Sequence, residues 1–238
     1  MTNDSYLFMH GASNRFLVYL GDGNIKKLRM KLNGADGLLL VQKDSEVDAF
    51  VRIINADGTE AEQCGNGLRC VALHLVRSNL VNKNELQIRT LAGVSKCVVR
   101  EDCNEVEVTL CVPTVETTVI QEFPNLVFVN MGNPNAVCWT EEDPLEVLEQ
   151  LGKQISMNSQ FVNGMNVHFA RRDGIQHATC ASFERGVGKT HASGTGGASV
   201  FVASDTDGPF YVSSVGGTLT YRYNENGEVV MAGPACYE

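Results

Sequence analysis

Two short glycine-rich segments of this chain nearly repeat each other. The first reads Cys64-Gly65-Asn66-Gly67 and the second reads Ser193-Gly194-Thr195-Gly196, and an apolar run of helix-like composition follows each. Such a duplication constrains the chain to fold as two similar halves. Backbone amides at the start of a helix can point at an anion. We therefore expect two helix N-termini to serve one site, with the residue before each acting on one face of the same carbon.

Composition narrows the class of protein. The chain has 238 residues and a formal net charge of −9, so it is long enough for two modest domains and lacks the basic stripe of a general nucleic-acid binder. We expect a small-molecule partner and no nucleic acid. No apolar stretch approaches the roughly 20 residues that span a bilayer, and Met1–Tyr6 lacks the pattern of a secretory signal. A cytoplasmic protein without membrane contact is therefore expected.

The eight cysteines are scattered without a CxxC pair, so no metal site is predicted. Cys64 differs from the others because its glycine context places it at a helix N-terminus, where the dipole favours the thiolate. The remaining cysteines are interpreted as small buried or incidental residues, with the exception of Cys70, which lies within the repeated motif's helix.

Alternating and β-branched segments predict a chain rich in strands. We expect them at Tyr6–His10, Arg15–Leu20, Leu38–Gln42, Ala49–Asn55, Glu85–Arg89, Val94–Arg100, Val106–Val112, Asn166–Arg171, Gln176–Phe183, Phe210–Val215, Thr218–Tyr223 and Val229–Met231.

Helical signals are fewer. Apolar residues spaced three and four apart over Leu68–Val76 predict a helix buried inside a sheet, and Ala198–Ala203 is its short counterpart. Asp143 as N-cap, Pro144 at the first helical position and Gly152 just past the end predict a surface helix. One apolar helix per half among so many strands favours an α+β fold with a mixed sheet over a doubly wound parallel sheet.

The boundary between the halves is expected where the chain becomes rich in Thr, Val and Glu, around Pro113–Pro124. We assign residues 1–115 to the first half, with the last residues, about 230–238, returning to it, and residues 116–229 to the second. Nucleotide binding is disfavoured. Gly188-Lys189-Thr190 resembles the tail of a phosphate loop, but Phe183 stands where that loop needs glycine, and Gly65-x-Gly67 lacks the third glycine of a dinucleotide fingerprint.

The segment Asn55–Cys70 (NADGTEAEQCGNGLRC) closely resembles the diaminopimelate epimerase family. The second half agrees through Gly132-Asn133-Pro134, through Asn166 after Gly164, and through Glu184–Gly188 running into Ala192–Gly196, and Met231–Ala235 resembles the closing strand. The resemblance implies two pseudo-symmetric domains, each a mixed or antiparallel sheet wrapped around a central helix, with the active site in the cleft between them. The family tendency favours a homodimer.

The resemblance also implies an activity that uses no cofactor and no metal. It is the interconversion of LL- and meso-diaminopimelate for lysine and peptidoglycan-precursor synthesis, by thiol acid/base chemistry on both faces of the α-carbon. Cys64 fills the first thiol position and Ser193 the second. The remaining roles fall into three implied sets: the amides of Gly65, Asn66, Gly194 and Thr195 on the α-carboxylate; Asn14 and Glu184 on the reacting ammonium; Asn55, Asn133, Asn166 and Arg185 on the distal end.

Ser193 is the main departure from the family pattern. A hydroxyl is far less acidic than a thiol, whose reference pKa is about 8.5, so we expect impaired epimerisation. An engineered change, a paralogue with altered chemistry, and slow turnover through Ser193 or water all remain open. Two further readings compete: a related racemase or epimerase of another polar amino acid, and a non-catalytic amino-acid-binding homologue. Other departures are Arg15, Asn135, Lys189 and His191, and His191 is favoured as a loop residue over an auxiliary proton carrier.

Overall fold

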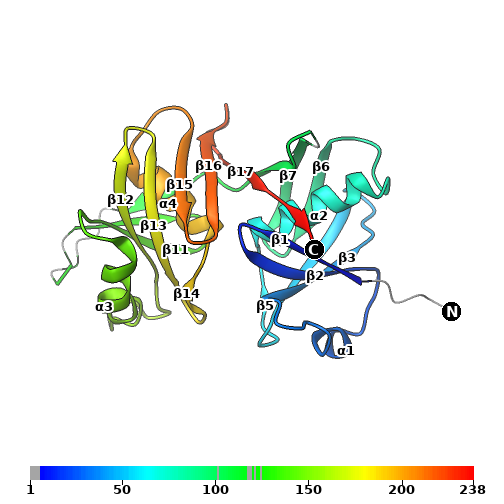
Figure 1. Cartoon of the computed structure of the whole chain (residues 1–238), viewed down its shortest axis with the longest axis horizontal. Coiled ribbons are helices and arrows are strands. Elements are labelled where there is room, and N and C mark those ends of the chain that lie inside the picture. Colours follow the sequence, from blue (N-terminus) through cyan, green and yellow to red (C-terminus); the bar gives the residue numbers. More distant parts are fainter. Residues whose placement is uncertain (1–5, 101, 117–119, 121, 124) are drawn as a thin grey trace. The chain divides into compact units, whose positions relative to one another are not determined.

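The computed structural model describes residues 6–100, 102–116, 120, 122–123 and 125–238, and the chain forms two compact units. Unit 1 comprises Met1–Thr109 and Ala232–Glu238, and unit 2 comprises Leu110–Met231. The chain thus leaves unit 1 once and comes back to it with its last residues (Figure 1). Both units are α+β and dominated by strands, which confirms the predicted fold class.

Unit 1 is a mixed sheet wrapped around one helix. Along this sheet, the pairs β1–β2, β3–β4 and β6–β7 are antiparallel, and the pairs β2–β3 and β4–β6 are parallel. Both parallel pairs need a crossover, and helices α1 and α2 lie in these connections. The elements are β1 (Tyr6–Gly11), β2 (Asn14–Leu20), α1 (Ile25–Arg29), β3 (Gly37–Gln42), β4 (Ala49–Asn55), β5 (Glu60–Ala61), α2 (Gly65–Arg77), β6 (Glu85–Thr90), β7 (Gly93–Arg100), β8 (Glu105–Thr109) and β18 (Cys236–Tyr237).

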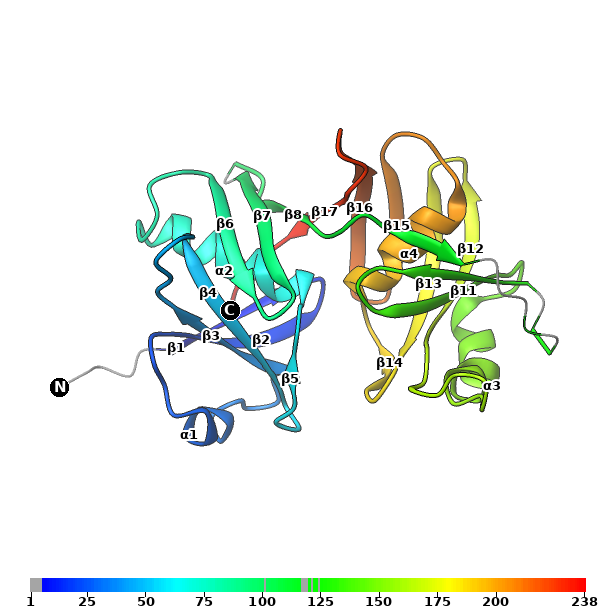
Figure 2. The same cartoon turned by 180° about the vertical axis from the view of Figure 1, so that it is seen from behind.

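Unit 2 repeats this plan. From β10 through β11, β12, β13 and β15 to β16 the pairs are again antiparallel, parallel, antiparallel, parallel, antiparallel, and α3 and α4 lie in the two parallel crossovers (Figure 2). The pseudo-symmetry expected from the repeated motif is therefore confirmed. The elements are β9 (Thr114–Glu116), β10 (Leu126–Asn130), β11 (Pro134–Trp139), α3 (Pro144–Ser156), β12 (Asn166–Gly174), β13 (His177–Glu184), β14 (Gly188–Thr190), α4 (Gly194–Ser204), β15 (Phe210–Ser214), β16 (Gly217–Tyr223) and β17 (Val229–Pro234), whose end lies in unit 1.

Each unit encloses its central helix. Helix α2 packs against β1, β2, β3, β6, β7 and β8, and α4 packs against β10, β11, β12, β13, β15 and β16. Every residue of α2 from Gly65 to Val76 is buried, including the guanidinium-bearing Arg69, whose Nε donates to the carbonyl of Pro234 at 3.2 Å. That bond ties the returning C-terminal segment to the central helix of unit 1.

Helix α3 departs from its predicted end. Asp143 is its N-cap, with Oδ1 accepting from Leu145 N at 2.8 Å, and Pro144 is its first residue, as predicted. The helix does not stop at Gly152 but continues to Ser156. Gly152 instead provides room for β13, because a Cβ there would lie 3.3 Å from the Cβ of Phe183. The glycine marks a close helix-to-strand approach, and the prediction of a C-terminal stop was wrong.

Other differences concern short elements. Helix α1 and strands β5, β9, β10, β11, β14 and β18 were not predicted, and β8 ends at Thr109 rather than at residue 112. Within the expected crossover at Pro113–Pro124, the structure forms β9, while residues 117–119, 121 and 124 lie outside the described part of the chain.

Burial of the central helix predicts a large penalty for truncating it. Leu68 is 0% exposed in α2, so Leu68→Ala should lower the free energy of unfolding by about 2–5 kcal/mol through lost apolar contact and a residual cavity. Leu80→Ala, at a side chain that is 55% exposed just after the helix, should change it by less than about 0.5 kcal/mol. Urea denaturation followed by circular dichroism measures both, and equal effects would contradict the enclosed position of α2.

Candidate functional site

The N-terminus of α2 gathers three of the predicted site residues in unit 1. Cys64 is the N-cap, with extended backbone at φ −149°, and its side chain makes no capping hydrogen bond. Its Sγ lies 3.8 Å from Oδ1 of Asn14, at the start of β2, and Asn66 Nδ2 donates to the same oxygen at 3.5 Å. Asn66 is 3% exposed, and its own Oδ1 accepts no hydrogen bond from the described residues. Buried polar atoms are normally hydrogen-bonded, so this oxygen is available to a donor group.

Asn55 lies apart from this cluster, at the turn between β4 and β5. Its Nδ2 donates to Oγ1 of Thr59 at 2.9 Å, and its backbone N–H donates to the carbonyl of the same residue at 2.8 Å. The side chain is half-buried. The structure therefore holds Asn55 in the turn that leads to Cys64.

The N-terminus of α4 is the counterpart in unit 2. Ser193 is its N-cap, and Oγ accepts from the backbone N–H of Gly196 at 3.0 Å. Gly194 and Thr195 follow at the half-buried first turn, and Tyr221 Oη donates to the carbonyl of Gly194 at 3.1 Å. The hydroxyl thus caps its helix where the thiol in unit 1 does not. Replacing Ser193 with a poorer acceptor therefore removes an N-cap, which typically costs about 1 kcal/mol.

Glu184 ends β13 close to this helix start. Burial raises the pKa of its carboxyl, and hydrogen bonds from the hydroxyls of Thr190 and Ser193 oppose that rise without cancelling it. Thr190 Oγ1 donates to Oε1 at 2.9 Å. The carboxyl therefore holds a proton more readily than an exposed glutamate does, and it lies within reach of the residue at the second thiol position.

Asn133, Asn166, Arg185 and Thr195 come together in unit 2. Asn133 Nδ2 donates to Oγ1 of Thr195 at 3.3 Å, and the backbone N–H of Arg185 donates to Oδ1 of Asn166 at 2.9 Å. The guanidinium of Arg185 is exposed and donates to the carbonyl of Asn163 at 3.1 Å. The grouping joins the β10–β11 turn, the start of β12, the end of β13 and the start of α4.

Two buried residues that were not predicted as site residues connect this group. Asn135 Nδ2 donates to Oδ1 of Asn133 at 2.8 Å, and Asn135 Oδ1 lies 3.0 Å from Nε2 of His168. His168 is 0% exposed, and burial lowers its pKa to about 3. The sequence held one signal for His168. It lies two residues after Asn166, and residues at this spacing share one face of a strand, here β12.

The remaining departures from the family pattern lie at the surface. His191 is exposed in the loop before α4. Lys189 pairs with Glu149 at 2.7 Å, and Arg15 pairs with Glu238 at 2.5 Å. These pairs are solvated, so each contributes little to stability.

Three cysteines other than Cys64 are buried, and two of them, Cys97 and Cys180, belong to the set expected to be buried or incidental. Burial raises the pKa of the Cys70, Cys97 and Cys180 thiols to about 12. Among the residues that the structure describes, no group of three or more His, Cys, Asp or Glu side chains is placed to hold a metal ion. No helix in the same part of the chain is long and apolar enough to cross a membrane.

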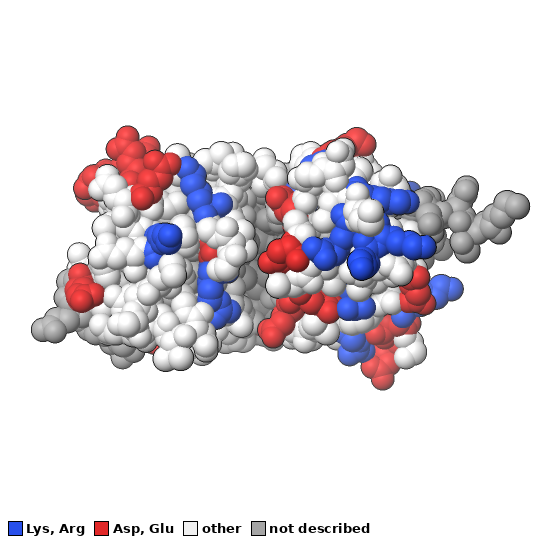
Figure 3. Space-filling view, turned by 90° about the horizontal axis from the view of Figure 1, so that it is seen from below, with Lys and Arg blue, Asp and Glu red and all other residues white. Residues whose placement is uncertain are grey.

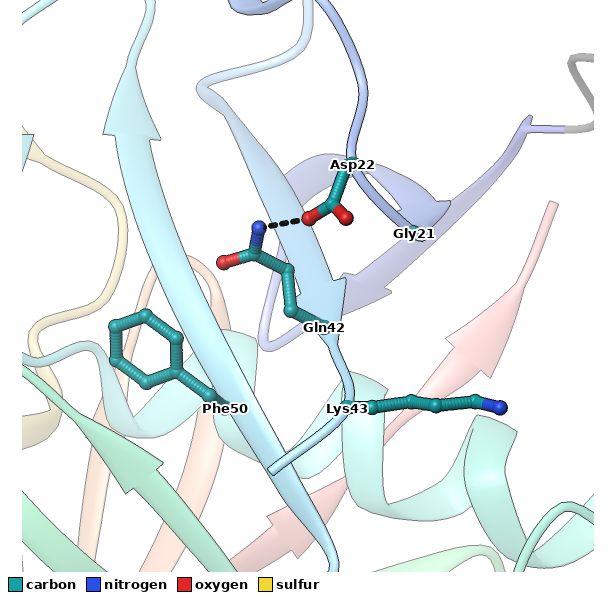
Figure 4. Close-up of a pocket in the computed structure, with 5 residues that line it drawn as sticks. All are labelled: Gly21, Asp22, Gln42, Lys43 and Phe50. Carbon is teal, nitrogen blue, oxygen red and sulfur yellow. Dashed lines mark hydrogen bonds between the residues drawn. The ribbon is translucent and has the colours of Figure 1, made fainter. Parts of the chain in front are cut away.

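The basic patch of unit 1 and the larger of two hollows lie away from the predicted site residues. Lys and Arg gather on the face of unit 1 that carries α1, where Lys26, Lys27 and Lys31 are exposed (Figure 3). A surface hollow of about 400 Å³ in unit 1 contains no predicted site residue and is lined by Gly21, Asp22, Gln42, Lys43 and Phe50, with Gln42 Nε2 donating to Asp22 (Figure 4). A second cavity, of about 10 Å³, lies beside Ser193 and has room for no more than one water.

Known proteins resemble this chain over most of its length. The family model described as diaminopimelate epimerase matches residues 9–115 and 127–238. A diaminopimelate epimerase of Carboxydothermus hydrogenoformans is 33% identical, over 97% of this chain and 96% of the relative, and one of Desulfitobacterium hafniense is 32% identical, over 86% and 81%.

Two solved structures share the fold at low sequence identity. A PhzF-family phenazine biosynthesis protein of Bacillus anthracis has a TM-score of 0.75 at 17% identity, over 98% of this chain and 96% of that one. A hydroxyproline epimerase of Agrobacterium vitis with bound trans-4-hydroxy-L-proline has a TM-score of 0.71 at 17% identity, over 98% and 88%. At 17% identity, both matches show a shared fold alone.

Burial of neutral His168 predicts a specific pH dependence. The unfolded chain protonates this imidazole below its ordinary pKa of 6.5, whereas the folded chain does so only near 3. The unfolded state therefore binds more protons in that window, and stability falls as pH drops from about 6.5, by up to about 1.4 kcal/mol per pH unit. His168→Gln should show a shallower slope between pH 5 and 7.5 in urea denaturation. The exposed control His191→Gln should keep the wild-type slope, and three equal slopes would contradict the burial of a neutral His168.

Proposed function

We propose, from the premise that the chain belongs to the diaminopimelate epimerase family, that it acts on diaminopimelate by cofactor-independent proton transfer at the α-carbon. The observation that carries this proposal is the paired N-cap. In both units a proton-bearing side chain, Cys64 or Ser193, stands directly before the first turn of the enclosed helix. The same family supports a place in lysine and peptidoglycan-precursor synthesis, a cytoplasmic setting and a homodimer.

The chemistry begins with a weakly acidic proton. Backbone amides at the starts of α2 and α4 hold the α-carboxylate and absorb charge that develops as the Cα–H bond breaks. Asn14 and Glu184 receive the ammonium, and the buried Oδ1 of Asn66 is a further acceptor for an N–H group. Cys64, as thiolate, takes the proton from one face, and the opposite face is addressed by Ser193.

Ser193 makes the two faces unequal. A hydroxyl that is hydrogen-bonded to a helix amide and to a carboxyl, and that is intrinsically far less acidic than a thiol, is a poor base and a reluctant donor. In this proposal Cys64 exchanges the α-proton of one configuration, while return of a proton to the other face limits turnover. The impairment lies in the second proton transfer rather than in substrate binding.

The polar group of unit 2 favours a substrate that carries a second carboxylate. Asn133 Oδ1 accepts from Asn135, and Asn166 Oδ1 accepts from the backbone of Arg185, so both oxygens are already engaged. Asn133 Nδ2 donates one hydrogen to Thr195 and Asn166 Nδ2 donates one to Asn135, which leaves a second N–H on each amide and the guanidinium of Arg185 for a ligand. These remaining donors match a carboxylate, which only accepts. This supports diaminopimelate over an amino acid without a distal acid.

A second candidate rests on Ser193 itself. A homologue that retains the binding groups but not the second thiol can serve as an amino-acid-binding protein without turnover. A third candidate, an epimerase of another polar amino acid, is favoured by Asn135 at the position where the family usually has His. Measurable turnover excludes the binding protein, and preference for diaminopimelate within a panel of amino acids excludes the third.

Isotope exchange tests the proton chemistry. In deuterated buffer, the chain should exchange the α-proton of one configuration of diaminopimelate through Cys64, with little net epimerisation. Ser193→Cys should raise epimerisation by about 10²-fold or more, the usual worth of a positioned general acid or base, and Cys64→Ala should abolish exchange. Proton NMR and chiral chromatography measure both, with Cys103→Ser, an exposed cysteine, as the control.

Two outcomes decide the proposal. If neither the chain nor Ser193→Cys exchanges either stereoisomer, the proposed activity is wrong. Full-rate epimerisation with Ser193 in place would instead refute the assignment of Ser193 as the source of impairment.

The distal carboxylate is tested at Arg185. Arg185→Gln removes a charge-assisted hydrogen bond and should raise the KM for diaminopimelate about 10- to 100-fold in the Ser193→Cys background, with a smaller change in kcat. The matched control is Arg171→Gln, on β12 of the same unit, where Nε is paired with Asp173 at 3.2 Å. An unchanged KM for Arg185→Gln would remove Arg185 from the binding group.

A further inference from the structure

We propose that His168 is a positioning residue which, through Asn135, fixes the amide of Asn133 so that only its N–H groups face the ligand. This inference rests on the proposed function and deepens it, because it names the residue that sets the preference for a second carboxylate. The two ring nitrogens of His168 are hydrogen-bonded to Ser182 and Asn135. Its effect passes through a directed chain of hydrogen bonds within unit 2.

The direction of that chain follows from the donors available. Asn135 Nδ2 donates to Oδ1 and to the carbonyl of Asn133, both at 2.8 Å, so both amide hydrogens of Asn135 are used. Its Oδ1 therefore faces His168 and needs a donor. A neutral imidazole has one donor and one acceptor, so Nε2–H donates to Asn135 Oδ1 at 3.0 Å. Nδ1 then accepts from the hydroxyl of Ser182 at 2.9 Å.

The orientation of Asn133 depends on this direction. An amide side chain can rotate by 180°, which exchanges its oxygen and nitrogen. Two donated hydrogen bonds from Asn135 hold Asn133 with Oδ1 inward and Nδ2 toward Thr195. Without the donor from His168, Asn135 Oδ1 keeps only the longer hydrogen bond from Asn166 Nδ2 at 3.4 Å, so the amide of Asn135 is held less firmly and can rotate to present oxygen to Asn133. Asn133 would then turn its oxygen toward the ligand, where it repels a carboxylate.

Burial gives these bonds their strength. Asn135 is 1% exposed and His168 is 0% exposed, so water does not compete for either side chain. In this surrounding an unpaired polar atom is costly, and one arrangement of the amides is strongly preferred. Asn166 Nδ2 lies 3.4 Å from Asn135 Oδ1, so both asparagines of the binding group share the same anchor.

His168 also lies under the first turn of α4. A Cβ on Gly196 would be 2.4 Å from Cε1 of the imidazole, so the ring occupies the space that only glycine leaves open at this position. The same turn carries Thr195, the partner of Asn133, and the amide that Ser193 caps. The imidazole therefore supports both partners of one contact. It orients Asn133 through Asn135, and it packs under the turn of α4 that carries Thr195.

The experiment compares His168→Gln with His168→Leu in the Ser193→Cys background. Gln retains a side-chain N–H near the position of Nε2, whereas Leu fills the space and donates nothing. The substrates are diaminopimelate, 2-aminopimelate, which keeps the distal carboxylate, and 2-aminoheptanoate, which replaces it with a methyl group. KM and kcat are measured for each, with circular dichroism at pH 7.5 confirming that the variants are folded.

We expect His168→Leu to raise the KM for diaminopimelate and 2-aminopimelate about 10-fold, to leave that for 2-aminoheptanoate within about 2-fold, and to change kcat little. The preference for a distal carboxylate should collapse accordingly. His168→Gln should retain most of it. A loss that is equal for all three substrates would show a merely structural role and overturn the inference, as would equal behaviour of Gln and Leu.

A second variant keeps the inference testable if His168→Leu does not fold. Asn135→Asp has the same shape but cannot donate to Asn133, so it should remove the preference for the distal carboxylate in the same way. Retention of the preference would overturn the inference. Absence of all exchange and turnover in the Ser193→Cys parent would count against the proposed function instead, which separates the two failures.

Discussion

Enclosure of one helix by the sheet of each unit is the constraint on which the rest of the structure depends. The first backbone N–H groups of a helix have no partner within it. At an exposed helix, water supplies that partner, but the first turn of α2 is buried and that of α4 is half-buried. In α4 the Ser193 hydroxyl satisfies one amide, whereas in α2 the Cys64 side chain caps none. These amides are the groups that the proposed function assigns to the α-carboxylate of the substrate.

Much of this fold can be predicted from the sequence because its signals are local. The apolar spacing over Leu68–Val76 identifies α2, and alternation identifies most strands that flank it. Elements with weak local signals were missed. Helix α1 has five residues and one buried side chain, Leu28, so its periodicity is too short to detect. Gly152 was misjudged because its close approach to Phe183 joins residues that only the folded chain brings together.

The candidate site likewise contains residues that the sequence motifs predicted and residues that they did not. The motifs identified the residues at both helix starts, and Asn133, Asn166 and Arg185 do meet in unit 2. Asn55 is held by its own turn instead. Asn135 and His168 carry no motif of their own. Their relation is a hydrogen bond across 33 residues between neighbouring strands, and only the parallel pairing of β11 with β12 makes it visible. A polar residue within an apolar strand is the trace that such a pair leaves in a sequence.

The return of the chain to unit 1 has a consequence for synthesis on the ribosome. Residues 110–231 form unit 2 and are made before Ala232–Glu238, which belong to unit 1. The carbonyl of Pro234 receives the buried Arg69, and β18 pairs with β1 at Met9 and His10. The first unit to emerge is therefore the last to be completed, because these two contacts of unit 1 wait until the second unit has been translated. Unit 2, whose chain is continuous, has no such delay and can fold first.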